Sequence, residues 1–149
     1  MDYKSKIILI AGPTASGKSK IAINLAKKIN GEIINADSMQ VYKQLKILTA
    51  RPSEKDKKNI RHHLFGIIDV QKRFSTGQWL KKCVKIINLI RKKKKTPIIV
   101  GGTGLYFKAL VDGLVRIPKF KPSEKNKILM LHNKLGQKHF YKKLVKLDP

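Results

Sequence analysis

The chain contains little cysteine and no long apolar segment. Cys83 is the single cysteine among 149 residues, so an internal disulfide is excluded and a reducing cytoplasm is the expected location. No segment approaches the ~18 apolar residues of a membrane-spanning helix, and the apolar run near the N-terminus is too short for a signal peptide. We therefore expect a soluble intracellular protein without a membrane partner.

Acidic residues are also scarce. The formal net charge is +25, because 34 Lys and Arg stand against 9 Asp and Glu. Such a charge favours polyanionic partners, since a basic protein that binds nucleic acid releases counterions from it. A biased genome composition accounts for lysine in place of arginine, but it does not account for the shortage of acids. Nucleic acid is therefore the expected partner.

Clusters of metal-ligating side chains are missing as well. Only the adjacent pair His62 and His63 stands out. Neighbouring side chains on a strand point to opposite faces, so we do not expect these two rings to share a zinc ion. Cys83 has no partner cysteine and lies on a predicted apolar helix stripe, which favours core packing over a role as nucleophile or ligand.

What the sequence does contain is a phosphate-binding signature, GPTASGKS, at residues 12–19. It fits the pattern G-x-x-x-x-G-K-[ST] and follows Lys6–Ile10, an apolar run that predicts a buried strand. Apolar residues at helical spacing come next, and we expect their helix to end at Gly31. The members of this stripe are Ile21, Ala22, Leu25, Ala26 and Ile29.

Strand, glycine loop and helix in this order predict an anion site at the helix N-terminus. Lys18 is expected to reach the outer phosphates, and the Ser19 hydroxyl is expected to bind Mg²⁺. The residues assigned to this phosphate site are Gly12, Pro13, Thr14, Ala15, Ser16, Gly17, Lys18 and Ser19.

Two further strands and a helix are predicted in the middle of the chain. Residues 32–42 open as a short strand and end in a polar turn that contains Asp37, Ser38 and Gln40, and residues 62–70 form another apolar run. Ser75 and Gln78 form a capping box, which predicts the start of a helix. Phe74 is expected to pack against Trp79, followed by an apolar stripe and fraying in residues 91–95. The stripe consists of Leu80, Cys83, Val84, Ile87 and Ile90.

Residues 97–106 predict a buried strand, a second glycine-rich turn and a helix from about residue 105 to 112. Strands separated by helices indicate an α/β fold with a parallel sheet and helices on both faces, similar to the P-loop NTPases. Ligands of such sheets bind beyond the carboxyl ends of the strands. The glycine loop, the Asp37 turn and the Thr103 turn are therefore expected to line one crevice. A small-molecule kinase fits this pattern as well as any other enzyme.

Five sequence motifs favour one class of enzyme over the others: GPTASGKS, NADSMQVYK, TARPS, RHHL and PIIVGGTGLY. In this order and at these separations they resemble the tRNA dimethylallyltransferases, which attach a five-carbon isoprenoid to an adenosine next to the anticodon of tRNA. The resemblance implies that the loop holds the diphosphate of dimethylallyl diphosphate instead of ATP, together with Mg²⁺. It covers the whole chain, residues 1–149, as one incomplete prenyltransferase domain whose C-terminal helical region is truncated.

The resemblance also implies residue roles. Lys18 stabilises the departing diphosphate and Thr14 lies near the scissile oxygen, while Asp37 is the candidate general base for the adenine amine. A turn cap or a water-mediated magnesium contact is the alternative role for Asp37. The residues expected to contact tRNA at the anticodon stem-loop are Asp37, Ser38, Met39, Gln40, Thr103 and Lys125.

Two other functions stay open for this sequence. An ATP-dependent kinase would use Lys18 and Ser19 in the same way, and its product would carry the γ-phosphate of ATP. A noncatalytic RNA-binding fragment would bind RNA without prenyl transfer. A monomer is expected in each case.

Overall fold

The computed structural model describes residues 6–115 and 121–148. It divides into two compact units, Met1–Leu114 and Val115–Pro149. The single domain expected for residues 1–149 stays a prediction, because compactness does not decide whether two units fold separately.

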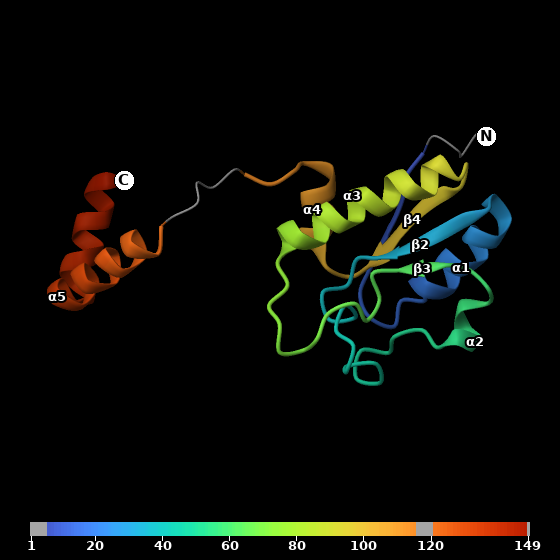
Figure 1. The fold of residues 1–149 in the computed structure, drawn as a ribbon, viewed down its shortest axis with the longest axis horizontal. Helices are drawn as coiled ribbons and strands as arrows, with labels where there is room; N and C mark the ends of the chain where they lie inside the picture. Colours follow the sequence, from blue (N-terminus) through green and yellow to red (C-terminus); the bar gives the residue numbers. More distant parts are fainter. Residues whose placement is uncertain (1–5, 116–120, 149) are drawn as a thin grey trace. The chain divides into compact units, whose positions relative to one another are not determined.

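The first unit contains a four-stranded sheet in the order β1-β4-β2-β3, and every neighbouring pair is parallel. Parallel neighbours need crossovers, and helices supply most of them (Figure 1). The strands are β1 (Ile8–Ala11), β2 (Gly31–Asn35), β3 (His62–His63) and β4 (Thr96–Gly101). The helices of this unit are α1 (Lys18–Ile29), α2 (Glu54–Lys57), α3 (Thr76–Lys92) and α4 (Gly104–Val111). The predicted parallel α/β architecture is confirmed.

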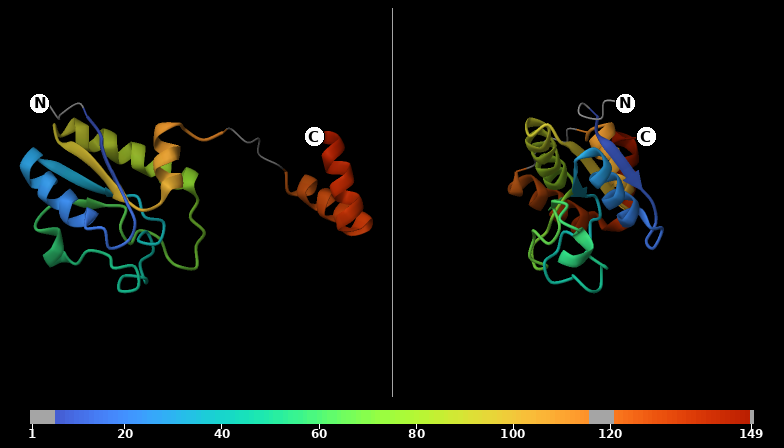
Figure 2. Two further views of the ribbon diagram at one scale, coloured as in Figure 1. Left: turned by 180° about the vertical axis from the view of Figure 1, so that it is seen from behind. Right: turned by 90° about the vertical axis from the view of Figure 1, so that its right-hand side faces the viewer.

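Helices cover both faces of this sheet, as predicted. Successive residues of a strand point to opposite faces, so Ile33 and Ile98 pack with α1 while Ile34 and Ile99 pack with α3 and α4. Figure 2 shows α1 and α3 on opposite sides of the strands. The α1 face also buries Ala22, Ile23, Ala26 and Val100, and the other face buries Ala36, Leu64, Trp79, Cys83, Ile87, Ile90 and Tyr106.

Helix α1 differs from the prediction in its end and in one stripe position. It ends at the cap residue Asn30, whose φ of 54° is left-handed, and Gly31 is the first residue of β2. A Cβ at Gly31 would lie 2.8 Å from Ile98 Cδ1, so close packing explains this glycine. Ile21 is 57% exposed, and Ile23 takes its place against the sheet.

Two strand predictions are wrong in part. Lys6–Ile10 was expected to be buried, but β1 lies at the edge of the sheet and Leu9 is 40% exposed. The strand expected over residues 62–70 is limited to β3, because Leu64 and Gly66 adopt φ values of 62° and 58°. Its continuation is a single bridge between Tyr42 and Ile68.

Helix α3 begins as predicted. Ser75 Oγ accepts from the Gln78 amide at 3.2 Å, and Gln78 Oε1 accepts from the Ser75 amide at 2.9 Å. Phe74 packs against the cluster that contains Trp79. The helix ends at Lys92, inside the predicted basic run. Its stripe is buried at Cys83, Ile87 and Ile90, whereas Leu80 is half-buried and Val84 is exposed.

Cys83 packs in the core, which confirms its predicted role. The side chain has no exposed surface, and burial raises the pKa of the thiol to about 12. A thiol with this pKa carries almost no thiolate at neutral pH, so it is a poor nucleophile.

The second unit contains α5 (Pro122–Leu147), in which Gly136 has non-helical angles, φ 71° and ψ 164°. No described residue of α5 is buried, and several of its apolar side chains are exposed, including Ile128, Leu129, Met130, Tyr141 and Leu144. Across residues 6–115 and 121–148 no helix combines the length and the apolar character needed to cross a membrane.

Candidate active site at the carboxyl ends of the strands

The Gly12–Ser19 loop connects β1 to α1. Ala15 and Gly17 have φ values of 64° and 78°, in the left-handed region, and Gly17 is the residue that caps α1. Turns of this kind bring successive amides to one side of the backbone, and the helix N-terminus adds a favourable dipole for anions. Thr14 and Ser16 are exposed on the same loop. The predicted phosphate loop is therefore at the carboxyl end of β1.

The Lys18 side chain folds back over this loop. Its ammonium donates a hydrogen bond to the Pro13 carbonyl oxygen at 2.8 Å, and Ser19 is exposed in the first turn of α1. An ammonium group in this position can exchange the carbonyl oxygen for a phosphate oxygen, because both are hydrogen-bond acceptors.

The Asp37 turn follows β2 and is held by Asn35. The buried Asn35 side chain accepts from the Asp37 amide at 2.9 Å, and it donates to the Asp37 and Leu64 carbonyl oxygens at 2.9 and 3.2 Å. Sequence reasoning missed this role of Asn35. The available signal was a polar amide at the end of an apolar strand, where burial demands a hydrogen-bond partner.

One oxygen of the Asp37 carboxylate caps its own turn. Asp37 Oδ1 accepts from the Met39 amide at 2.8 Å and from the Gln40 amide at 3.3 Å. Oδ2 has no hydrogen bond within the described parts of the chain. The carboxylate therefore caps the turn with one oxygen, while the other has no hydrogen-bond partner in the described structure.

The Thr103 turn follows β4 and joins the Asp37 turn. Thr103 Oγ1 accepts from the Ser38 amide at 2.9 Å and donates to Ser38 Oγ at 3.2 Å. The Thr103 amide donates to the Ala36 carbonyl oxygen at 3.1 Å. A Cβ at Gly101 would lie 2.1 Å from that oxygen, so only glycine permits the approach of β4 to the turn. Hydrogen bonds between Ser38 and Thr103 thus join the two turns.

The Gly12–Ser19 loop contacts the end of β4, just before the Thr103 turn. The Gly12 amide donates to the Gly101 carbonyl oxygen at 3.3 Å, and a Cβ at Gly102 would lie 3.2 Å from the Gly12 carbonyl oxygen. The three turns predicted to share a crevice are therefore neighbours. Lys125 is the exception among the predicted site residues, because it lies on α5 in the second unit.

Two aromatic residues support the Asp37 turn from the α3 and α4 side of the sheet. Trp79 Nε1 donates to the Asn35 carbonyl oxygen at 2.8 Å, and the Trp79 ring stacks on Tyr106 with centroids 4.2 Å apart. Burial raises the pKa of Tyr106, and the nearby Tyr42 and Asp37 raise it further. Sequence reasoning predicted Trp79 as a helix residue that packs against Phe74, but not its contact with the Asp37 turn.

Gln40 links the Asp37 turn to the next loop. Its side-chain amide donates to the Thr49 carbonyl oxygen at 2.8 Å, and its own carbonyl oxygen accepts from the Gly66 amide at 2.9 Å. Arg51 Nη1 donates to the Tyr42 carbonyl oxygen at 3.2 Å. The contacts of Gln40 with Thr49 and of Arg51 with Tyr42 hold residues 43–51 beside the turn.

His62 and His63 have different neighbours, in line with their alternation on β3. His62 Nδ1 lies 2.8 Å from the Ile60 carbonyl oxygen, and burial lowers the pKa of its ring. His63 Nε2 lies 2.7 Å from Oε2 of the buried Glu32, whose Oε1 is 3.0 Å from Lys95 Nζ. This ion cluster begins in the second residue of β2, away from the carboxyl ends that carry the three turns.

Comparison with known proteins gives the family. The model of the IPP transferase family matches residues 40–149. The chain belongs to the IPP transferase family. The tRNA dimethylallyltransferase of Pelagibacter ubique (strain HTCC1062) is 64% identical to it over 149 residues, which are 100% of this chain and 48% of that protein. The Caulobacter enzyme of the same name is 45% identical over 97% of this chain and 47% of its own length.

Solved structures agree with the family and the fold. The tRNA isopentenylpyrophosphate transferase of Bacillus halodurans matches 97% of this chain and 48% of its own length, with 34% identity and a TM-score of 0.74. A eukaryotic dimethylallyltransferase acting on tRNA matches 96% of this chain and 36% of its own length, with 35% identity and a TM-score of 0.82. The chain thus spans about half the length of the curated relatives it matches.

Proposed function

We propose that this chain provides the donor site and the catalytic base of a tRNA dimethylallyltransferase. The observation that carries the proposal is the junction of the Gly12–Ser19 loop with the Asp37 and Thr103 turns through Gly101 and Ala36. A diphosphate in the loop and a nucleobase at Asp37 would be neighbours in such a crevice. The names of the relatives, tRNA dimethylallyltransferases, supply the substrates.

The proposed reaction transfers the five-carbon dimethylallyl group from its diphosphate to adenosine. The exocyclic amine of adenosine attacks the first carbon of the dimethylallyl group, the carbon–oxygen bond breaks, and diphosphate leaves. The loop amides and Lys18 stabilise the charge that accumulates on the leaving group, with Thr14 beside the scissile oxygen. Asp37 accepts the amine proton, because its Oδ2 is available while Oδ1 caps the turn.

Magnesium fits the donor site of this proposal. Mg²⁺ usually keeps several waters and takes few protein ligands in addition to phosphate oxygens, so the exposed Ser19 hydroxyl is a sufficient protein ligand. When bound, the ion would neutralise part of the diphosphate charge.

The acceptor of the proposed reaction is the anticodon stem-loop of tRNA. The adenosine must leave its base stack to reach the Asp37 carboxylate, and the free energy of unstacking is smallest in a single-stranded loop. Met39, which is 49% exposed, would contact the extruded nucleoside together with Ser38 and Thr103. Lys125 would contribute a phosphate contact from the second unit. We expect the enzyme to act in the cytoplasm as a monomer.

The proposal is tested by isotope transfer. This chain is fused to the remaining half of the Pelagibacter relative, in place of the matching 149 residues. With dimethylallyl diphosphate labelled in carbon, an anticodon stem-loop with an unpaired adenosine should acquire the label, and the same RNA with guanosine at that position should not. Transfer of the γ-phosphate from labelled ATP to a small molecule, without prenyl transfer, would make the protein a kinase. RNA binding with neither transfer would leave only a binding function.

A further inference from the structure

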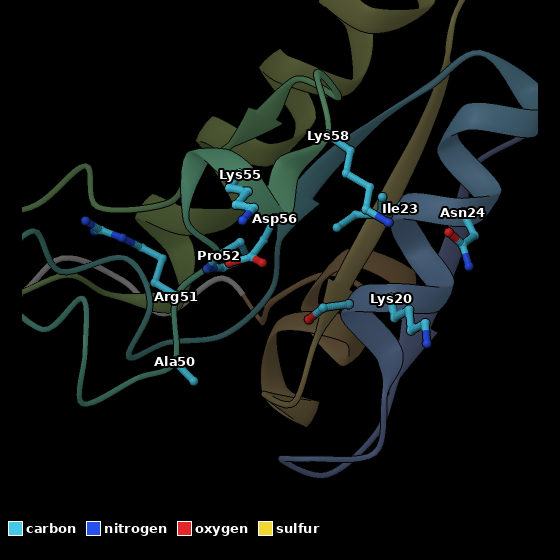
Figure 3. Close-up of a pocket in the computed structure, with 10 residues that line it drawn as sticks. Lys20, Ile23, Asn24, Ala50, Arg51, Pro52, Lys55, Asp56 and Lys58 are labelled. Atoms are coloured by element: carbon cyan, nitrogen blue, oxygen red, sulfur yellow. The ribbon is translucent and has the colours of Figure 1, made fainter.

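A pocket of about 660 Å³ lies within the first unit, between α1 and the segment 50–58 (Figure 3). Its size is in the range of sites for small molecules or single nucleotides. Apolar surface comes from Ile23, Ala50 and Pro52, and polar surface from Ser19, Lys20, Asn24, Arg51, Lys55, Asp56 and Lys58. Lys58 extends from the α2 side of the pocket toward Ile23 on α1.

The charges around this pocket are strongly unbalanced. Three lysines, Lys20, Lys55 and Lys58, stand against one carboxylate, Asp56, whereas the Arg51 guanidinium is directed away from the pocket and donates to the Tyr42 carbonyl oxygen (Figure 3). Hydrogen bonds from the hydroxyl and the amide of Ser53 to Asp56 Oδ2 lower the pKa of this carboxylate. Within the described parts of the chain none of these three lysines forms an ion pair with an acid. The pocket therefore favours an anion.

The pocket adjoins the diphosphate site and shares Ser19 with it. Of the Gly12–Ser19 loop, only Ser19 lines the pocket, so neither Lys18 nor the loop glycines are directed to it. The opposite wall, Ala50–Pro52, is linked to the Asp37 turn by the hydrogen bonds from Gln40 to Thr49 and from Arg51 to Tyr42. A ligand in the pocket would thus lie next to both the Gly12–Ser19 loop and the loop that is linked to the Asp37 turn.

We propose that this pocket binds a backbone phosphate of the RNA strand beside the adenosine held at Asp37. The inference rests on the proposed function, because it takes the RNA from there. A strand that presents one base to Asp37 must carry its neighbouring phosphates past the adjoining loop. Lysine side chains at the mouth of a pocket neutralise such phosphates without reading the base, so the site contributes affinity and position but no sequence specificity.

The experiment compares two triple variants that lose the same charge. Lys20→Gln, Lys55→Gln and Lys58→Gln empty the pocket of three cations. Lys81→Gln, Lys82→Gln and Lys85→Gln remove three exposed lysines from α3, on the opposite face of the sheet. Binding of a fluorescent anticodon stem-loop to the 149-residue chain is measured by anisotropy over a series of KCl concentrations. Circular dichroism and melting curves establish that both variants are folded.

The pocket variant should bind the stem-loop roughly tenfold more weakly at low salt, and the α3 variant should lose much less. The slope of log K against log salt should fall by about 0.7 for each phosphate contact that is lost. Equal losses in the two variants would overturn the proposal and assign RNA affinity to surface charge in general. If the unaltered chain bound no RNA, the RNA part of the proposed function would fail as well.

Two further measurements identify the source of the phosphate. An RNA with an uncharged methylphosphonate link next to the target adenosine should bind the unaltered chain more weakly, but the pocket variant should not distinguish it from normal RNA. Affinity for dimethylallyl diphosphate should be the same in the pocket variant and the unaltered chain. A parallel loss of diphosphate affinity would make the pocket part of the donor site and overturn the assignment to RNA.

Discussion

At the scale of single residues, the site depends on side chains that the fold leaves available. Lys18 is engaged only with the Pro13 carbonyl oxygen, and Asp37 keeps one carboxylate oxygen without a partner in the described structure. Both residues could be selected from sequence because a spacing pattern and a family resemblance mark them. For Asn35 the sequence offers only a polar amide at the end of an apolar strand, because its three hydrogen-bond partners are brought together by the folded turn.

Replacing Lys18 with alanine should weaken the binding of dimethylallyl diphosphate about 10- to 100-fold. Loss of a hydrogen bond between charged groups is worth about 1.5–3 kcal/mol, which corresponds to this range. Titration calorimetry measures the effect, with Lys27→Ala at the other end of α1 as the control. Unchanged affinity of the Lys18 variant would remove the loop as the diphosphate site.

Gly101 carries the contact between β4 and the Asp37 turn, because an added Cβ would lie 2.1 Å from the Ala36 carbonyl oxygen. Gly101→Ala should therefore lower the free energy of unfolding by about 1–3 kcal/mol. Gly104→Ala is the matched control, since no atom lies within 4 Å of its Cβ position and alanine suits a helix. Urea unfolding should separate the two variants. If they were equally stable, the close approach would not be required.

At the scale of elements, local patterns predicted helices better than strands. The capping box at Ser75 and Gln78 gave the start of α3, and the apolar run from Pro97 gave β4. The burial of β1 was predicted wrongly because strand order is a property of the whole sheet, and β1 lies at its edge. The end of β3 was missed because the left-handed φ of Leu64 is unusual for a bulky residue.

Strand β2 depends on an ion cluster that no sequence pattern indicated. Burial alone would raise the pKa of Glu32, but hydrogen bonds from His63 and Lys95 outweigh it, and the pKa lies below its ordinary value of 4.5. Because folding lowers this pKa, the ionised carboxylate stabilises the protein above pH 4.5, and the contribution is lost as the pH falls through the lowered pKa.

Glu32→Gln should therefore lower the free energy of unfolding by about 2 kcal/mol at neutral pH. The difference from the unaltered chain should shrink in acid, below the folded pKa of Glu32. Urea titrations at several pH values measure it, and Glu54→Gln, in an exposed pair with Lys57, should change stability little. A difference that stayed constant with pH would show that ionisation of Glu32 does not stabilise the fold.

At the scale of the whole molecule, the sheet topology explains why motifs that are far apart in the sequence form one site. A parallel sheet directs all carboxyl ends to one edge, so the turns after β1, β2 and β4 meet although they are far apart in sequence. This grouping was predictable once alternating strands and helices were recognised. The pocket beside α1 was not, because its far wall is an irregular loop whose position depends on Gln40 and Arg51.

The central claim is that the Gly12–Ser19 loop binds the donor diphosphate, whereas Asp37 accepts the proton of the adenosine amine. Asp37→Asn tests it most directly, because asparagine retains an oxygen to cap the Met39 and Gln40 amides but lacks a basic carboxylate. The measurement is single-turnover transfer of a labelled dimethylallyl group to an anticodon stem-loop by the fusion with the Pelagibacter half, together with titrations of each substrate.

The rate should fall by ~10²- to 10⁴-fold, the usual contribution of a general base, while affinity for dimethylallyl diphosphate and for RNA stays within about twofold. Near-normal transfer by the Asp37→Asn variant would contradict the account and remove Asp37 as the base. A loss of donor affinity in proportion to the rate would contradict it too, and would place Asp37 with the magnesium and the diphosphate.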